Sequence, residues 1–266
     1  MKILLKIENY EKGVIIERLN RFVVKGQIKN KPVLAHLNNT GRLEDFLKKG
    51  KIGLFLPIAN KLKFRLSMIK ESKNIYSIID TSLQMKCFEI ALEKGYISWL
   101  KGAKILKRNF RINDSLIDYL IERKNKKYLL EIKSAVMKYK NFAMYPDCPS
   151  IRGQKHIKEL INIQTLQTKR RLGGKMFVQT TNNISVNPRI KYPRLSELYP
   201  YKSVMLFIAG MKNISAFSPN KNADPKIYKL LKIAKNKGVK IKAIQIYFDE
   251  KRKSVIFKND NLPVVL

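Results

Sequence analysis

The sequence is poor in acidic residues. Its 266 residues include 20 Asp and Glu against 55 Lys and Arg, which gives a formal net charge of +35. A chain this basic attracts polyanions, and neutralising phosphates would release counterions and make binding depend strongly on salt. Nucleic acid is therefore the expected partner. An anionic membrane surface is the competing partner, but no amphipathic basic helix with an aromatic face stands out, so we expect no membrane association.

Cysteine and histidine are also scarce. Cys87 and Cys148 lie far apart without the spacing of metal ligands, so neither a zinc site nor a disulfide framework is indicated. His36 and His156 are the only histidines, which argues against histidine-based metal or triad chemistry. No apolar run approaches the roughly 20 residues that cross a bilayer, and charges interrupt the start of the chain too early for a signal peptide. We expect a cytoplasmic protein.

Residues 1–80 contain short segments rich in β-branched and aromatic residues, with turn-prone breaks at 26–32 and 38–41. About five such strands favour a small antiparallel barrel, either an OB-fold, which is a common nucleic-acid platform, or another small barrel that serves as a spacer. The basic residues that would follow a nucleic-acid backbone along this barrel are Arg21, Lys25, Lys61, Lys63 and Arg65.

From residue 81 onward, helical and strand patterns alternate, which predicts a second domain, residues 81–266, of α/β type with a mixed sheet. The first helix has Thr81 or Ser82 as its N-cap and Gly95 as its stop. Asp224 caps a later helix that begins with proline. The predicted helices are 81–95, 150–171 and 225–237; the predicted strands are 104–112, 115–122, 128–135, 176–180, 204–210 and 239–248. Residues 182–201 look like an inserted loop, and the role of the longer stretch 164–202 is unassigned.

The segment 115–133, SLIDYLIERKNKKYLLEIK, is the most informative part of the chain, because it predicts two apolar strands joined by a polar turn. If the turn is 124–125, Asp118 faces Glu131; if it is 125–126, Asp118 faces Lys133. Side chains alternate faces with period two, so both registers place these three residues on one face. A three-residue turn would break the arrangement.

Facing carboxylates repel each other, and a divalent cation held between them would offset this repulsion. Mg²⁺ (or Mn²⁺) takes oxygen ligands, so Asp118, Glu131 and the carbonyl of Ile132 are the candidate ligands. Lys133 would orient the attacking water and offset charge on the phosphate. The alternative is a charge cluster on a half-exposed hairpin.

The predicted helix 81–95 carries two further glutamates, Glu89 and Glu93. Either one of them is a further ligand of the metal, or both are part of a solvated face of the helix.

Several blocks of sequence together resemble the sugar fermentation stimulation protein A family over almost the whole chain. HLNNTGRLEDFLKKG, from His36, is similar to that family's H-x-x-N-T-G segment, and SLIDYLI and LLEIKSAVM resemble its S-R-I-D-F-L and V-E-V-K-S blocks. YPDCPSIRGQKHIKEL, from Tyr145, resembles its F-P-D…R-G-x-K-H-L-x-E-L block. FSPNKNADPKIYKLLKIAKNKGVKI and the terminal LPVVL resemble its closing segments.

The resemblance implies a DNA-binding protein with an OB-like domain followed by a domain of the PD-(D/E)XK nuclease type. The family's nuclease pattern falls on Asp118, Glu131 and Lys133 in this sequence. On the following helix, it falls on the basic residues Arg152, Lys155 and His156. The chain departs from the family at Leu116, where an arginine is usual, so a DNA contact through that side chain is absent.

Two groups of polar residues are candidates for nucleic-acid binding. The first is a polar loop facing the cleft between the domains, where the candidates are His36, Asn39, Thr40 and Arg42; alternatively, the loop only shapes a turn with His36 packed beneath it. The second is a helix N-terminus, where basic side chains at 152, 155 and 156 would lie on phosphate. Its alternative is a solvated basic face.

The first functional hypothesis is a DNA-binding, Mg²⁺-dependent nuclease with little sequence specificity, whose catalytic residues are Asp118, Glu131 and Lys133. A non-catalytic DNA-binding or regulatory protein on a nuclease scaffold is the second. An RNA-processing factor is the third, because an OB-like domain tolerates different substrates. A homodimer would suit a cut of both strands.

Overall fold

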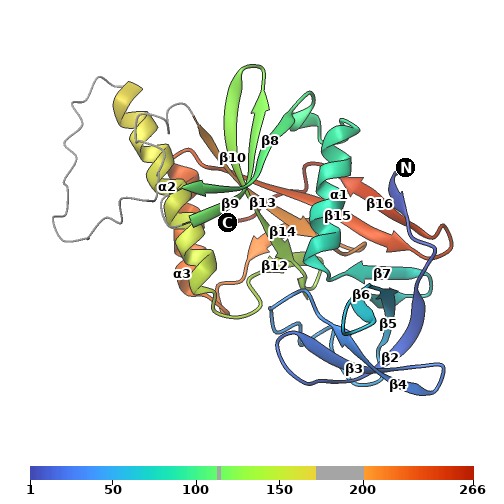
Figure 1. Ribbon diagram of the computed structural model, residues 1–266. Coiled ribbons are helices and arrows are strands. Elements are labelled where there is room, and N and C mark those ends of the chain that lie inside the picture. Colours follow the sequence, from blue (N-terminus) through green and yellow to red (C-terminus); the bar gives the residue numbers. More distant parts are fainter. Residues whose placement is uncertain (113–114, 172–200) are drawn as a thin grey trace.

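A computed structural model describes residues 1–112, 115–171 and 201–266 (Figure 1). The predicted strand at 176–180 and nearly all of the predicted loop at 182–201 lie outside the described residues. Among the described residues, no helix is long and apolar enough to cross a membrane.

Five strands form a small closed barrel, which confirms the predicted OB-like domain. Their order is β4-β3-β2-β5-β6, and a parallel pairing of β4 with β6 closes the ring. Phe55 fills the interior so tightly that a Cβ at Gly13 or Gly26 would lie 2.8 or 2.7 Å from its ring. The barrel strands are β2 (Glu11–Arg18), β3 (Val23–Ile28), β4 (Lys31–His36), β5 (Ile52–Pro57) and β6 (Phe64–Ser72).

A mixed sheet continues from the barrel in the order β7-β15-β13-β10-β9-β8, which confirms the predicted α/β architecture. The three central strands β10, β13 and β15 run parallel. Strand β13 is buried along almost its whole length, as expected for a parallel strand covered on both faces. The strands are β7 (Ile75–Ile78), β8 (Lys104–Ile112), β9 (Ser115–Arg123), β10 (Lys126–Ala135), β13 (Lys202–Ala209) and β15 (Lys240–Asp249).

The first strand of the chain lies in this mixed sheet. Strand β1 (Lys2–Lys6) pairs antiparallel with β16 (Ser254–Asn259), which in turn pairs with β15. The division of the chain at residue 80 did not anticipate this pairing. A second, small sheet holds β11 (Met137–Tyr139), β12 (Phe142–Tyr145) and β14 (Ala216–Pro219).

Helices cover both faces of the mixed sheet (Figure 1). On one face, α1 (Thr81–Glu93), followed by the short 3₁₀ helix η1 (Ser98–Leu100), packs in a buried cluster with alternate residues of β10 such as Leu130. On the other face, α2 (Ile151–Arg171) and α3 (Pro225–Asn236) pack in a cluster that contains Leu129. Consecutive residues of β10 therefore lie under different helices, as the period of a strand requires.

The helix caps agree with the sequence prediction at one helix and differ from it at another. Asp224 caps α3, because its carboxylate accepts a hydrogen bond from Ile227 N at 3.0 Å and proline follows. The prediction for α1 was wrong by one residue. Asp80, and not Thr81 or Ser82, is its N-cap, since the Asp80 carboxylate accepts from the amides of Ser82 and Leu83.

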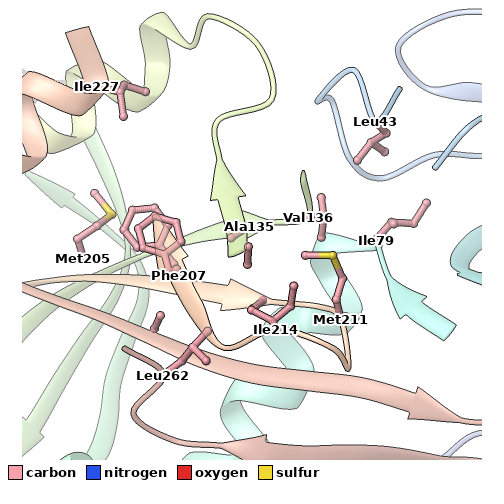
Figure 2. Packing of buried hydrophobic residues seen from close by; sticks show 14 of the residues in the cluster. Leu43, Ile79, Ala135, Val136, Met205, Phe207, Met211, Ile214, Ile227 and Leu262 are labelled. Carbon is pink, nitrogen blue, oxygen red and sulfur yellow. The ribbon is translucent and has the colours of Figure 1, made fainter. Parts of the chain in front are cut away.

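The barrel and the mixed sheet share one hydrophobic core (Figure 2). Leu43, from the loop after β4, belongs to the same buried cluster as Ala135, the last residue of β10, and Val136, which follows it. Ile79, which lies between β7 and α1, is also part of this cluster, and the cluster continues through Phe207 of β13. The barrel is therefore fixed to the sheet by buried apolar contacts in addition to the chain connection.

Truncation of Leu43 tests this shared core. Leu43→Ala should lower the free energy of unfolding by about 2–5 kcal/mol, the range for buried leucines, because it leaves a cavity where the two domains meet. Leu34→Ala is the control, since Leu34 lies on the barrel with 46% of its surface exposed, and should change stability by less than about 0.5 kcal/mol. Urea unfolding measures both. Equal effects of the two substitutions would contradict the shared core.

Candidate active site

The hairpin of β9 and β10 places the predicted catalytic residues. Its turn is the two-residue loop Lys124–Asn125, since Arg123 pairs with Lys126, and both turn residues have the positive φ that a tight hairpin turn of this length requires. This is the register in which Asp118 comes opposite Glu131. The predicted two-residue turn is confirmed, and the choice between the two registers is settled.

The two strands stop pairing where the carboxylates begin. The last paired residues are Tyr119 and Leu130. Beyond them, Ile132 N donates a hydrogen bond to Asp118 Oδ2 at 2.7 Å, and Asp118 N donates to Glu131 Oε2 at 3.3 Å. The side chains thus satisfy backbone groups that the ladder leaves without partners. This arrangement brings Asp118 and Glu131 together on one face of the sheet.

Glu131 is fully buried on the face covered by α2. Its Oε1 lies 2.5 Å from Lys133 Nζ and also contacts His156 Nδ1. Burial alone would raise the pKa of Glu131, but the charge of Lys133 and the contact with His156 outweigh it, so the pKa lies below its usual value. Glu131 is held as a carboxylate, which is the form that binds a cation.

Asp118 is half-buried beside Glu131 and differs from it electrostatically. Burial, followed by repulsion from the Glu131 carboxylate, raises the pKa of Asp118 to about 6. A raised pKa means that the ionised form is disfavoured in this structure. A cation placed between the two carboxylates would favour that form.

Lys133 completes the trio that the sequence predicted. Burial would lower the pKa of Lys133, but the carboxylate of Glu131, then Tyr145 and Asp118, outweigh this effect and raise it. The side chain is therefore a buried ammonium whose Nζ contacts Glu131 and which also lines a neighbouring cleft. Its positive charge therefore belongs both to the pair of carboxylates and to the lining of the cleft.

Of the two alternatives for Glu89 and Glu93, the structure excludes a role as further metal ligands. Glu89 accepts hydrogen bonds from Arg108 and from the hydroxyl of Tyr119. Tyr119 belongs to the cluster under α1, on the sheet face opposite to Glu131, and Glu93 is exposed on the same helix. Neither glutamate reaches Asp118, because α1 covers the other side of the sheet.

The described residues contain no group of three or more His, Cys, Asp or Glu side chains arranged to hold a metal ion. A cation at this site would therefore depend on the two carboxylates and the carbonyl of Ile132, with water or phosphate oxygens completing its coordination. This donor set consists only of oxygen, which fits Mg²⁺, Mn²⁺ and Ca²⁺.

His156 does not lie where a nucleic-acid contact requires it. It is 4% exposed, and its Nδ1 contacts Glu131 while its Nε2 accepts a hydrogen bond from Arg152 Nε at 3.5 Å. We correct its predicted role from contacting phosphate to positioning Glu131. Arg152 and Lys155 are exposed on the first turns of α2, so their predicted roles are open to test.

The predicted barrel residues fall into two groups. Asn39 is buried, donates to Ile79 O at 3.0 Å and accepts from Gly41 N at 3.0 Å; it shapes the loop, which corrects its predicted contact with phosphate. Arg65 is half-buried near Asp80, with an N–O distance of 3.6 Å, and His36 is half-buried, with no hydrogen-bond partner for its Nδ1 among the described residues. The exposed residues, which remain candidates, are Thr40, Arg42, Lys61 and Lys63.

A cleft of about 690 Å³ adjoins the site where the barrel meets the mixed sheet. The loop after β4 forms one wall, and Lys133 with the segment between β12 and α2 forms the other. Asp147 links the walls by accepting a hydrogen bond from Leu43 N at 2.8 Å. Gly41 permits this approach, because a Cβ there would lie 2.6 Å from the Asp147 carboxylate.

Sequence reasoning missed the residues that hold this cleft in shape. Arg18, the last residue of β2, donates from one guanidinium nitrogen to the carbonyls of Gly41 and Arg42, both at 2.6 Å. These hydrogen bonds fix the loop after β4 to β2. Tyr145 lies close enough to Lys133 for the lysine's charge to act on its hydroxyl. One feature of the sequence could have indicated Tyr145 and Asp147 as residues of the site. Both belong to the YPDCPS segment, which comes directly before the basic helix.

Comparison with known proteins gives a consistent result over the whole chain. The model described as "SfsA N-terminal OB domain" matches residues 16–78, and the model described as "Sugar fermentation stimulation protein RE domain" matches 82–191 and 194–252. A sugar fermentation stimulation protein homolog from Pyrococcus furiosus is 37% identical over 237 residues, covering 89% of this chain and 88% of the relative. A homolog from Archaeoglobus fulgidus is 35% identical and covers 99% of each.

One solved structure matches the whole fold. It is titled "The structure of Pyrococcus Furiosus SfsA in complex with Ca2+", and it superposes with a TM-score of 0.83 at 34% identity, covering 100% of both chains. Its agreement extends through the barrel and the mixed sheet together. The chain therefore belongs to the sugar fermentation stimulation protein family.

Proposed function

We propose that this protein is a divalent-metal-dependent nuclease that hydrolyses DNA with little sequence specificity. The observation that carries the proposal is the convergence of Asp118, Glu131 and Lys133 on one face of a buried hairpin, beside a cleft, in a chain of net charge +35. Carboxylates are scarce in this chain, yet two lie together where burial makes them costly. A functional requirement explains such an arrangement better than stability does.

A relative supports the metal part of the proposal. The Pyrococcus furiosus protein has been solved in complex with Ca²⁺, and Ca²⁺ selects the same oxygen donors as Mg²⁺. In this chain, Asp118, Glu131 and the carbonyl of Ile132 would hold the cation. Mg²⁺ or Mn²⁺ bound there would supply Lewis acidity toward the phosphate and lower the pKa of a bound water.

The side chains of the protein would perform the remaining tasks. Lys133 would orient the attacking water and offset the negative charge that develops on the phosphate. His156 would hold the Glu131 carboxylate in place from α2. The exposed cations that line the cleft, Arg21 and Arg152, would contact phosphates and not bases, which explains the proposed lack of sequence preference.

A non-catalytic DNA-binding protein is the second candidate, and one observation favours it. Glu131 already contacts both Lys133 and His156, so its charge has partners without a cation. If these contacts persist when metal is supplied, the site would retain affinity for nucleic acid without hydrolysis. RNA, the third possibility, would be separated by competition between DNA and RNA at several salt concentrations.

Removal of the central carboxylate tests catalysis. Glu131→Gln should reduce Mg²⁺-dependent cleavage of plasmid and single-stranded DNA by at least about 100-fold, as expected when a group that stabilises the transition state is lost. Glu89→Gln is the matched control, since Glu89 is also hydrogen-bonded but lies on the other face, and should cleave normally. Equal cleavage by Glu131→Gln and wild type would point to a contaminant. DNA binding without cleavage by wild type would support the non-catalytic candidate.

The stability of the metal-free protein should depend on pH through Asp118. Its pKa is raised from 3.8 to about 6 on folding, so the folded state binds more protons between these values and Asp118 lowers stability as pH rises through them. Asp118→Asn should therefore match wild type near about pH 4 and exceed it by up to about 3 kcal/mol near about pH 7, since one pKa unit corresponds to ~1.4 kcal/mol.

Urea unfolding in a chelator, at several pH values, measures this difference. Mg²⁺ added at neutral pH should then stabilise wild type more than the variant, because a cation that binds only the folded state shifts the equilibrium by mass action. A stability difference that stays constant with pH would contradict the assignment to Asp118.

A further inference from the structure

The lining of the cleft beside the candidate active site has a polar part and an apolar part. Its polar part includes Lys133 and the exposed cations Arg21 and Arg152. Among the described residues that line it, Asp147 is the one acid, and it accepts a hydrogen bond from Leu43 N. The cleft is therefore complementary to phosphate. Its apolar part is formed by Val136, Met137, Met144, Pro146, Pro149 and Ile151.

Ile151 is the unusual member of this lining. It is the first residue of α2, and 83% of its surface is exposed, more than any other large hydrophobic residue described. Single exposed apolar side chains are common on protein surfaces. This one, however, stands at a cleft, next to exposed Pro149 and to Arg152. Isoleucine and proline are among the side chains that unstack bases when they insert between them.

The reacting groups lie too deep for a phosphate on the outside of an intact duplex to meet them easily. The side chains of Glu131 and Lys133 are 1% and 15% exposed. The loop after β4 stands across the cleft from them, tied by Arg18 and Asp147. A strand must therefore enter the cleft, and a base inside a duplex does so only after leaving its stack.

The volume of the cleft fits one nucleotide. Pockets of roughly 300–1,000 Å³ hold small molecules of that size, and about 690 Å³ is available here. We propose that the cleft receives one unstacked nucleotide of a DNA strand, with its phosphate toward Lys133, its base against the methionines 137 and 144, and Ile151 keeping the neighbouring base apart.

This inference rests on the proposed nuclease function and narrows its substrate class. The preferred substrates are then single strands and junctions with unpaired nucleotides, and a continuous duplex is a poor substrate. The OB-like barrel is consistent with this choice, since such barrels bind single strands through stacking and backbone contacts.

The test measures binding without divalent cation, so that it does not depend on hydrolysis. Fluorescently labelled strands of one sequence are compared as single strand, duplex, and duplex with a short unpaired segment, using wild type, Ile151→Ser and Ile233→Ser. Ile233 is the matched control, because it is an exposed isoleucine (46%) on α3 that does not line the cleft. Both substitutions lie at exposed positions, and thermal unfolding checks that both variants fold.

We expect wild type and Ile233→Ser to bind the single strand and the junction more tightly than the duplex. Ile151→Ser should lose on the order of tenfold in affinity for the two unpaired substrates, comparable with the loss of one base-stacking contact, and should bind duplex unchanged. A 2-aminopurine placed in the unpaired segment should report unstacking with wild type and less of it with Ile151→Ser.

Three outcomes would overturn the inference: equal affinity of wild type for duplex and single strand, equal behaviour of the two serine variants, or tighter binding of a matched RNA strand. The cleavage assay with Mg²⁺ is read separately. If unstacking occurs but no substrate is cut, the nucleotide site stands and the nuclease proposal fails. If duplex and single strand are cut equally and Ile151→Ser has no effect, the nuclease proposal stands and the nucleotide site fails.

Discussion

The candidate site depends on the burial of one carboxylate, that of Glu131. An isolated carboxylate in a protein interior is very unfavourable, so the fold must supply partners. Lys133 supplies one from the same strand, His156 supplies another from α2, and the amide of Asp118 supplies a third from β9. The compensation therefore comes from three separate elements. The docking of α2 brings His156 to Glu131, and the separation of the hairpin strands frees the amide of Asp118 to donate to it.

Much of the hairpin could be predicted because its geometry is local. Alternation of side chains placed Asp118, Glu131 and Lys133 on one face without knowledge of the rest of the fold. The register could not be chosen, since both possible turns were polar, and it is the positive φ of Lys124 and Asn125 that selects one of them. The cap of α1 was missed for a similar reason: three good capping residues stand in a row, and only the backbone decides among them.

The role of His156 was misjudged because its sequence surroundings are basic. A signal was nevertheless present. Gly153, His156, Ile157, Leu160 and Ile163 follow helical spacing, and all five are buried on α2, so inclusion of the histidine in this apolar stripe would have placed it facing the sheet. The link between Asp147 and Leu43 is different. It joins segments 104 residues apart, and no local pattern indicates such a contact.

The pairing of β1 with β16 has a consequence for how the protein is made. Lys2 lies opposite Phe257, so β1 is synthesised long before the strand that pairs with it. The barrel strands, by contrast, follow one another closely and find their partners soon after emerging from the ribosome. Contacts between distant segments form slowly because a long loop must close first. We therefore expect the part of the mixed sheet formed by β1 and β16 to assemble after the barrel.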